Sequence, residues 1–111
     1  MKTTLVTDLH GQLLFFWCPA CQTHHAPRVS GGPGPLWTWN GDRDRPTVQP
    51  SIRVDGVAPV TDVQLAQIRA GEPFEPVPLR CHLFLTDGRI QYLGDCTHAL
   101  AGQIVDLQEM E

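Results

Sequence analysis

The sequence lacks any long apolar run, and no stretch approaches the roughly 20 residues of a membrane-spanning helix. Its start, Met1–Asp8, also lacks the apolar core of a secretory signal, so we expect a cytoplasmic protein with no membrane partner. Basic residues are scarce, with eight Lys and Arg against twelve Asp and Glu and a formal net charge of −4. Because phosphate neutralisation supplies most non-specific affinity for nucleic acid, this balance argues against a nucleic-acid partner.

The five histidines lack the spacings of catalytic zinc motifs. No H-E-x-x-H is present, and no histidine is followed two residues later by the glutamate that zinc deaminases use. The glycine-rich loop 31–35 is not followed by the Lys-Ser/Thr pair of a phosphate-binding loop. These absences argue against zinc-dependent catalysis and against nucleotide binding.

With 111 residues, the chain is long enough for one small domain and too short for two ordinary ones. Ten Gly and ten Pro predict many turns and little long helix. Extended segments are predicted at Gln12–Cys18, Thr23–Val29, Leu36–Asn40, Pro46–Val54 and Ile104–Leu107. The large aromatic residues expected in the core are Trp17, Trp37, Trp39 and Phe84. The predicted fold class is mainly β, a small β-rich α+β domain with an antiparallel sheet.

Residues 55–78 differ in character from the rest of the chain. Thr61 can cap a helix that Gly71 ends, and Gln64 stands three residues on, where a capping box needs it. Prolines flank the helix on both sides. We therefore interpret 55–78 as a helical insertion into a single domain of residues 1–111.

Residues 79–93 carry the clearest local signal, a β-hairpin whose strands are joined by an Asp-Gly turn. Side chains alternate between the two faces of a strand, and diagonal neighbours on paired strands lie within roughly 7–8 Å. If Asp and Gly are the two turn residues, Cys81 and Cys96 fall on one face at the open end of the hairpin. His82 and Asp95 fall on the other face. The register therefore predicts two different pairs of side chains, back to back.

The four cysteines then form a metal site. Cys18 and Cys21 have C-x2-C spacing, at which two thiolates of a tight turn reach one tetrahedral zinc. The hairpin supplies Cys81 and Cys96 as a second pair. Because the cytosol keeps thiols reduced, we expect one structural Zn²⁺ held by these four thiolates in a zinc knuckle, with no open position for substrate.

Three histidines provide alternative ligands. His24 and His25 follow the knuckle closely and could replace Cys81 or Cys96, and His98 is a further candidate. Without a metal, the four cysteines would be buried free thiols, or Cys81 and Cys96 would form a disulfide across the end of the hairpin.

The other face offers a catalytic interpretation. Asp95 can accept a hydrogen bond from the imidazole of His82, orienting the ring and favouring its protonated form. Ser51 lies in an extended segment that two prolines make rigid, and a serine nucleophile needs such a base beside it. The three residues could form a Ser-His-Asp triad, with His98 as another candidate for the third member. The alternative is a structural serine and a structural or surface His–Asp pair.

Several motifs in combination resemble a family of small phage and bacterial proteins, often labelled uncharacterised or ammonia monooxygenase. These motifs are Phe16–Cys21, Leu36–Asp42, Pro46–Ile52, Arg80–Ile90 and Gly94–Gln103, and they cover most of the chain outside residues 55–78. Longer relatives look like the serine peptidase component of bacterial ubiquitin-like conjugation operons.

This resemblance implies that the serine of Pro-Ser-Ile, Ser51, and the histidine before the apolar-aromatic strand, His82, form a hydrolytic pair. The longer forms have a denser N-terminal cysteine cluster and lack the element Asp95–His98, so the third catalytic residue and the ligand set are not carried over.

We therefore expect a zinc-stabilised serine hydrolase of peptidase type, acting on the C-terminal tail of a ubiquitin-like or other small protein. Ser51 would attack a carbonyl, His82 would move the proton and Asp95 would orient His82. The alternative is a non-catalytic zinc-ribbon-like binding module of phage origin, which engages a host protein through residues 55–78.

Overall fold

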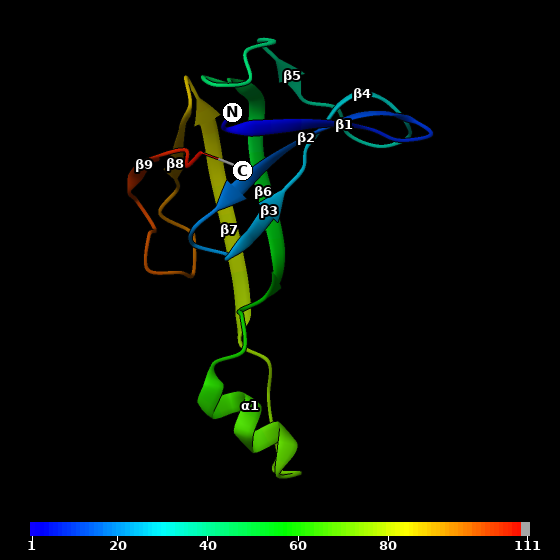
Figure 1. Cartoon of the computed structure of the whole chain (residues 1–111). Coiled ribbons are helices and arrows are strands. Elements are labelled where there is room, and N and C mark those ends of the chain that lie inside the picture. Colours follow the sequence, from blue (N-terminus) through cyan, green and yellow to red (C-terminus); the bar gives the residue numbers. More distant parts are fainter. Residues whose placement is uncertain (110–111) are drawn as a thin grey trace.

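The computed structural model describes residues 1–109 and arranges their strands in two antiparallel sheets (Figure 1). The first sheet contains β1 (Thr3–Thr7), β2 (Gly11–Cys18), β3 (Thr23–His25) and β4 (Arg28–Gly31). The second contains, in spatial order, β5 (Thr38–Trp39), β6 (Val48–Val57), β7 (Pro78–Thr86), β8 (Arg89–Tyr92) and β9 (Ile104–Asp106). A short helix, α1 (Asp62–Arg69), connects β6 to β7. The mainly β fold class is confirmed.

The core lies between the two sheets, and the burial pattern of β7 shows which face of the second sheet contributes to it. Cys81, Leu83 and Leu85 alternate with polar or exposed residues, and each has 0% of its surface exposed. Because side chains at every second position share a face, this pattern turns one side of β7 inward. Leu14 and Phe16 of β2 are also fully buried and belong to the same cluster. The first sheet thus covers one face of the second sheet, and the outer face of the second sheet stays accessible.

The hairpin β7–β8 has the predicted register. Thr86 pairs with Arg89 and Leu83 with Tyr92, on either side of Asp87 and Gly88. Both turn residues have positive φ, 51° at Asp87 and 76° at Gly88. Two positive φ values are what the common two-residue hairpin turn requires, and Asp-Gly tolerates them well.

The structure differs from the sequence-based expectation at β1, which pairs along β2 from Thr3↔Phe16 to Thr7↔Gln12. From the sequence, no strand is predicted in this segment. Thr3 is buried all the same, and its hydroxyl donates to the carbonyl of Arg43 at 2.7 Å. Thr3 and Leu5 face inward at alternate positions, so pairing with β2 and a weak inward alternation together determine this element.

The expectation that Phe84 lies in the core is wrong, because its side chain is 38% exposed. It lies between buried residues of β7 and so points to the outer face. Trp37 and Trp39 are partly buried and pack against the core, as expected.

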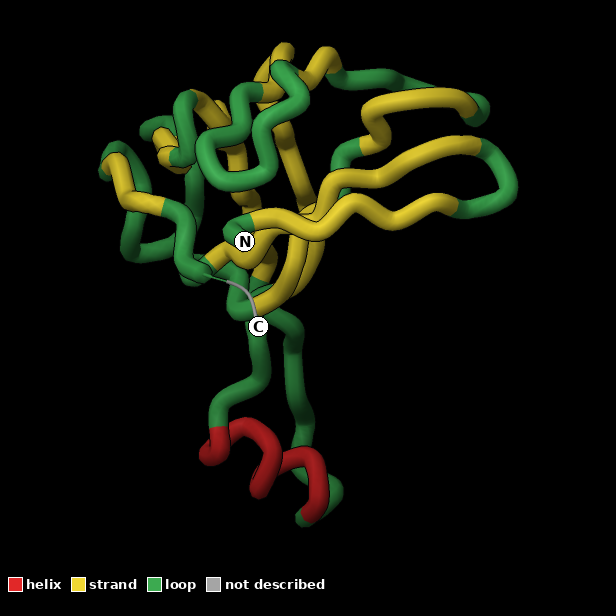
Figure 2. The backbone as a smooth tube through the Cα atoms, turned by 45° about the horizontal axis from the view of Figure 1, so that its top comes forward, coloured by secondary structure: helices red, strands yellow, loops and turns green. Residues whose placement is uncertain are grey.

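The helical segment lies apart from both sheets (Figures 1 and 2). Its capping box is present, because Thr61 Oγ1 accepts from the amide of Gln64 at 3.2 Å and Gln64 Oε1 accepts from the amide of Thr61 at 2.9 Å. No residue of α1 is buried. Since β6 continues to Val57 and β7 begins at Pro78, the segment outside the sheet is 58–77. Within residues 1–109, no helix is both long and apolar enough to span a membrane.

Replacing residues 59–76 with a two-residue Asn-Gly turn between Ala58 and Val77, whose main chains already share a hydrogen bond, should leave both sheets folded. The helix buries none of its residues, and each halving of a loop saves about 0.6 kcal/mol of closure entropy. We expect a midpoint of thermal unfolding, followed by circular dichroism, at or above that of the full chain. A fall of more than about 5 °C would show that the helix stabilises the sheets.

Candidate active site and metal centre

Ser51 lies where β6 bulges against β7. Val48 pairs with Leu85 and Ile52 pairs with Leu83, so the three residues between Val48 and Ile52 face a single residue of β7. A bulge changes the direction in which a strand aims its side chains, and bulges are common beside active sites. Ser51 is half-buried and lies at this bulge, on the outer face of the second sheet, because the next residue, Ile52, points into the core.

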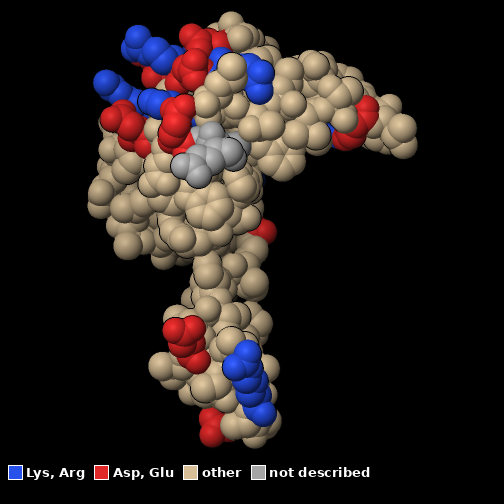
Figure 3. Space-filling model, in the orientation of Figure 1, with Lys and Arg blue, Asp and Glu red and all other residues tan. Residues whose placement is uncertain are grey.

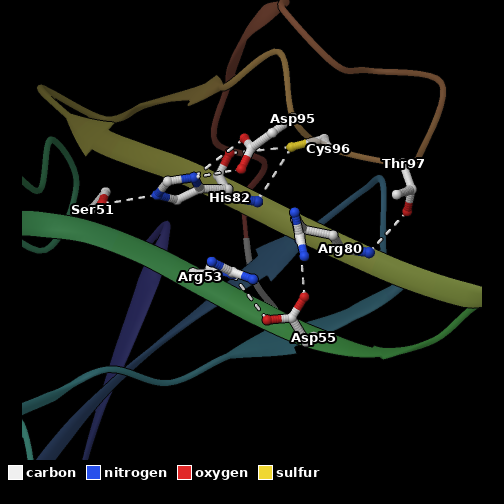
Figure 4. Close-up of polar contacts among 8 residues, drawn as sticks. All are labelled: Ser51, Arg53, Asp55, Arg80, His82, Asp95, Cys96 and Thr97. Atoms are coloured by element: carbon white, nitrogen blue, oxygen red, sulfur yellow. Dashed lines mark hydrogen bonds and ion pairs between the residues drawn. The ribbon is translucent and has the colours of Figure 1, made fainter.

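Ser51, His82 and Asp95 form a continuous chain of contacts (Figure 4). The hydroxyl of Ser51 is 3.0 Å from Nε2 of His82. The other ring nitrogen, Nδ1, is 3.1 Å from Oδ2 and 3.2 Å from Oδ1 of Asp95. This geometry suits a ring whose Nδ1–H donates to the carboxylate and whose Nε2 accepts from the serine hydroxyl. The side chains of His82 and Asp95 are 24% and 43% exposed, so solvent reaches the pair.

The hairpin explains why His82 and Asp95 meet. The amide of Leu93 donates to the carbonyl of His82 at 2.8 Å, which extends the pairing of β7 past the end of β8. Asp95 follows two residues later and lies on the same outer face as His82, as the register predicts.

Beyond Leu93, Cys96 and Thr97 continue the pairing with β7 and hold Asp95 in place. The thiol of Cys96 accepts from the amide of His82 at 3.2 Å and donates to its carbonyl at 3.1 Å. The hydroxyl of Thr97 accepts from the amide of Arg80 at 2.8 Å, and the amide of Thr97 donates to the carbonyl of Arg80 at 3.0 Å. These contacts replace the hydrogen bonds that a longer β8 would make, and they fix Asp95 beside the imidazole.

The charge of Asp95 is stabilised by its surroundings. The hydrogen bond from His82 holds the pKa of Asp95 below its usual range, and the positive charge of Arg80 acts in the same direction. Asp95 is therefore ionised at neutral pH and can stabilise a protonated imidazole.

Sequence reasoning missed an ionic cluster that lies beside Ser51, His82 and Asp95. Asp55 accepts from Nε of Arg53 at 2.9 Å and from Nε of Arg80 at 3.1 Å (Figure 4). The hydrogen bond from Arg80 is the largest cause that lowers the pKa of Asp55, followed by that from Arg53. The signal was present in the sequence, because strand alternation places these residues on the face that carries Ser51 and His82.

Charges at the tip of the β7–β8 hairpin are also paired. Arg45 contacts Asp87 at 2.8 Å, and Arg89 contacts Asp106 at 3.2 Å. In the view of Figure 3, acidic and basic side chains are interspersed in this region and along the helical segment. This visible face therefore has no extended patch of one sign.

A cluster of metal-binding residues lies on the inner side of β7. One donor atom from each of Cys18, Cys21, His25 and Cys81 lies within 4.8 Å of the others, and all four residues are buried. The sulfur atoms of Cys18 and Cys81 are 3.9 Å apart, and all four cysteines of the chain are free thiols. Three sulfurs and one imidazole are the donors of a closed four-coordinate metal site.

The thiols of this cluster strongly affect one another. The hydrogen bond from Cys81 lowers the pKa of Cys18 to about 3, whereas burial raises the pKa of Cys21 to about 11. The hydrogen bond to Cys18 also raises the pKa of Cys81. One thiolate thus discourages the ionisation of its neighbours, and a cation would allow all three to ionise.

His25 gives independent support for a metal. Its ring nitrogen Nε2 is buried and has no hydrogen-bond partner among the described residues. An unsatisfied buried polar group costs about 1–3 kcal/mol of stability. A metal ion bound by the imidazole of His25, directly or after the ring turns over, would offset this cost. The cluster therefore fits a bound metal ion.

Cys96, predicted as the fourth ligand, lies outside this cluster. It groups instead with Cys81 and His98, whose donor atoms also lie within 4.8 Å of one another. His25, one of the alternative ligands, completes the first cluster. His24 follows the strand alternation to the opposite face of β3 and is exposed.

The chain was compared with known proteins after this geometry was established. A family model described as "Bacterial ubiquitination-like system serine protease (BubE)" matches residues 1–93. No curated protein and no solved structure matches the chain. The matched range includes Ser51, His82 and the whole first metal cluster, and it ends two residues before Asp95. The chain thus belongs to the BubE family, the serine proteases of bacterial ubiquitination-like systems.

Proposed function

We propose that this protein is a serine peptidase in which Ser51 is the nucleophile, His82 the general base and Asp95 the residue that orients His82. The observation that carries this proposal is the 3.0 Å contact between Ser51 Oγ and His82 Nε2, with Asp95 on the other ring nitrogen. A serine hydroxyl is a weak nucleophile unless such a base removes its proton. The family description supports the same chemistry.

The reaction follows from this arrangement. Ser51 Oγ attacks the substrate carbonyl carbon while His82 Nε2 takes the hydroxyl proton. The C–N bond then breaks, His82 gives that proton to the leaving amine, and an acyl ester remains on Ser51. A water molecule, deprotonated by His82, attacks the ester and releases the acid, and the proton returns to Ser51 Oγ. Asp95 stays ionised and holds the ring through Nδ1.

The substrate we propose is the C-terminal tail of a ubiquitin-like or other small protein. Such a tail is extended and can approach a nucleophile on an open sheet face. Ser51 is half-buried on the outer face of the second sheet, where solvent also reaches His82 and Asp95.

For the metal, we propose one structural Zn²⁺ held by Cys18, Cys21, Cys81 and His25. Zinc favours closed sites of this donor type, in which it supplies folding energy rather than catalysis. In this position it would join the β2–β3 turn to β7, and so connect the two sheets of a single zinc-stabilised domain from which the helical insertion projects.

A fluorescent fluorophosphonate probe should label the wild-type protein and not Ser51→Ala, because the probe reacts with activated serines. The chain has one other serine, Ser30, which contacts the amide of Gln12 in the first sheet. Ser30→Ala is therefore a matched control that should be labelled like the wild type. Intact-mass spectrometry checks that one probe molecule is attached per protein chain. Absence of labelling in the wild type would support the binding-module alternative.

Asp95→Asn should slow labelling by about 10³- to 10⁴-fold, because an amide can hold the wrong tautomer of His82 and cannot stabilise its protonated form. The second-order rate constant for probe labelling measures this. Asp106→Asn, a change at an exposed ion pair on β9, is the control expected to react at the wild-type rate. Equal rates for Asp95→Asn and the control would remove Asp95 from the triad.

Metal analysis by plasma mass spectrometry should find about one zinc per chain, and Cys18→Ser should lose the metal and unfold. Cys96→Ser separates the two ligand sets. The variant keeps its zinc if His25 is the fourth ligand and loses it if the site contains four cysteines. A metal-free wild-type protein of full stability would contradict the zinc proposal.

A further inference from the structure

One edge of β6 is paired along its length with β7, but the other edge is mostly free. β5 covers only Val48 and Gln49 on that side. From Ser51 to Val57 no other strand of residues 1–109 pairs with this edge. An exposed edge of this length is a template for another extended chain.

The main-chain hydrogen bonds of β7 show which amides and carbonyls of β6 point to the free edge. The amide and carbonyl of His82 bond to Cys96 and Leu93, on the side away from β6. Arg53 is the partner of His82 in the register. In an antiparallel pair, facing residues either exchange both hydrogen bonds or neither. The amide and carbonyl of Arg53 therefore point away from β7, to the free edge.

The same argument applies two residues further along the strand. The amide and carbonyl of Arg80 bond to Thr97, so those of its partner Asp55 also point to the free edge. No hydrogen bond to the main chain of Arg53 or Asp55 from outside the strand pair occurs within residues 1–109. Two donors and two acceptors thus face outward with the spacing of a strand.

This free edge ends at the nucleophile. Ser51 is two residues from Arg53, about 7 Å along an extended strand. The carbonyl of Ser51 already accepts from the indole N–H of Trp37 at 3.2 Å. A chain paired with Asp55 and Arg53 therefore loses its pairing at Ser51, next to the side chain that His82 contacts.

We propose that an extended segment of a protein substrate binds as an added strand on β6, pairing with the main chain of Arg53 and Asp55 and presenting its scissile carbonyl to Ser51. This inference rests on the proposed peptidase function and adds how its substrate is held. The carboxylate of Asp55 accepts from both Arg53 and Arg80, so the proposed pairing uses the main chain of these residues and not their side-chain charges. Recognition is through the peptide backbone, which tolerates varied side chains.

A peptide-binding experiment tests this independently of catalysis. The probe is the C-terminal ten-residue tail of a bacterial ubiquitin-like protein, labelled with fluorescein, and binding to Ser51→Ala is followed by anisotropy. A series of peptides carries one N-methyl group at successive positions. Because every second amide of an added strand points to β6, methylation should weaken binding about five- to tenfold at alternate positions and have little effect between them.

The protein side of the edge is tested by Arg53→Pro, compared with Arg53→Ala, both made in the Ser51→Ala background. Both variants lose the guanidinium, but only the proline variant also lacks the backbone N–H that faces the free edge. Because this N–H makes no bond to β7, its loss leaves the β6–β7 pairing intact. We expect the proline variant to bind the tail about five- to tenfold more weakly than the alanine variant.

Three results would overturn strand addition: no alternation among the methylated peptides, no binding of the tail at all, or a dimer in sedimentation that Arg53→Pro dissociates. The last result would assign the edge to a second copy of the chain. Failure of the peptidase proposal is separate, since it appears as absent probe labelling of Ser51 in the wild type.

Discussion

Adjacent residues of an extended strand point to opposite faces, and both sites of this protein depend on that alternation at Cys81 and His82. Cys81 is fully buried and points toward Cys18 in the core. His82 points outward and contacts Ser51. A shift of one residue in the pairing of β7 would exchange the two faces, placing the imidazole in the core and the thiol in solvent. The tight turn of the β7–β8 hairpin and the buried face of β7 together prevent that shift.

The division between the faces suits the chemistry of each site. Sulfur ligands are best kept from solvent and oxidants, whereas a hydrolytic serine must be reached by a substrate and by water. A chain of 111 residues buries a modest core, so a metal ion held by the buried cluster would add rigidity where hydrophobic burial is limited. The buried cluster lies directly behind His82 on the same strand. The buried cluster therefore supports the position of the His82 imidazole from the opposite face of the strand.

Local sequence patterns predicted the parts that local geometry controls. The Asp-Gly turn determined the register that places His82 beside Asp95, and the C-x2-C spacing located the metal-binding knuckle. The position of His25, rather than Cys96, beside Cys18, Cys21 and Cys81 was not predictable, because it depends on how the first sheet packs over the second. β1 has little hydrophobic pattern and forms by pairing with β2. Likewise, the contact between Ser51 and His82 depends on the register of β6 against β7, two strands that the helical segment separates in the sequence.

The contacts among Ser51, His82 and Asp95 depend on two kinds of structural support. Ser51 and His82 lie on paired strands and within the range that the family model matches, residues 1–93. Asp95 lies beyond it, in a segment attached to β7 through the side chains of Cys96 and Thr97 rather than through a strand ladder. Because the thiol of Cys96 bonds to both main-chain groups of His82, it aligns the imidazole of His82 and the carboxylate of Asp95 together. Cys96 thus has a structural role that explains its position without requiring it to bind metal.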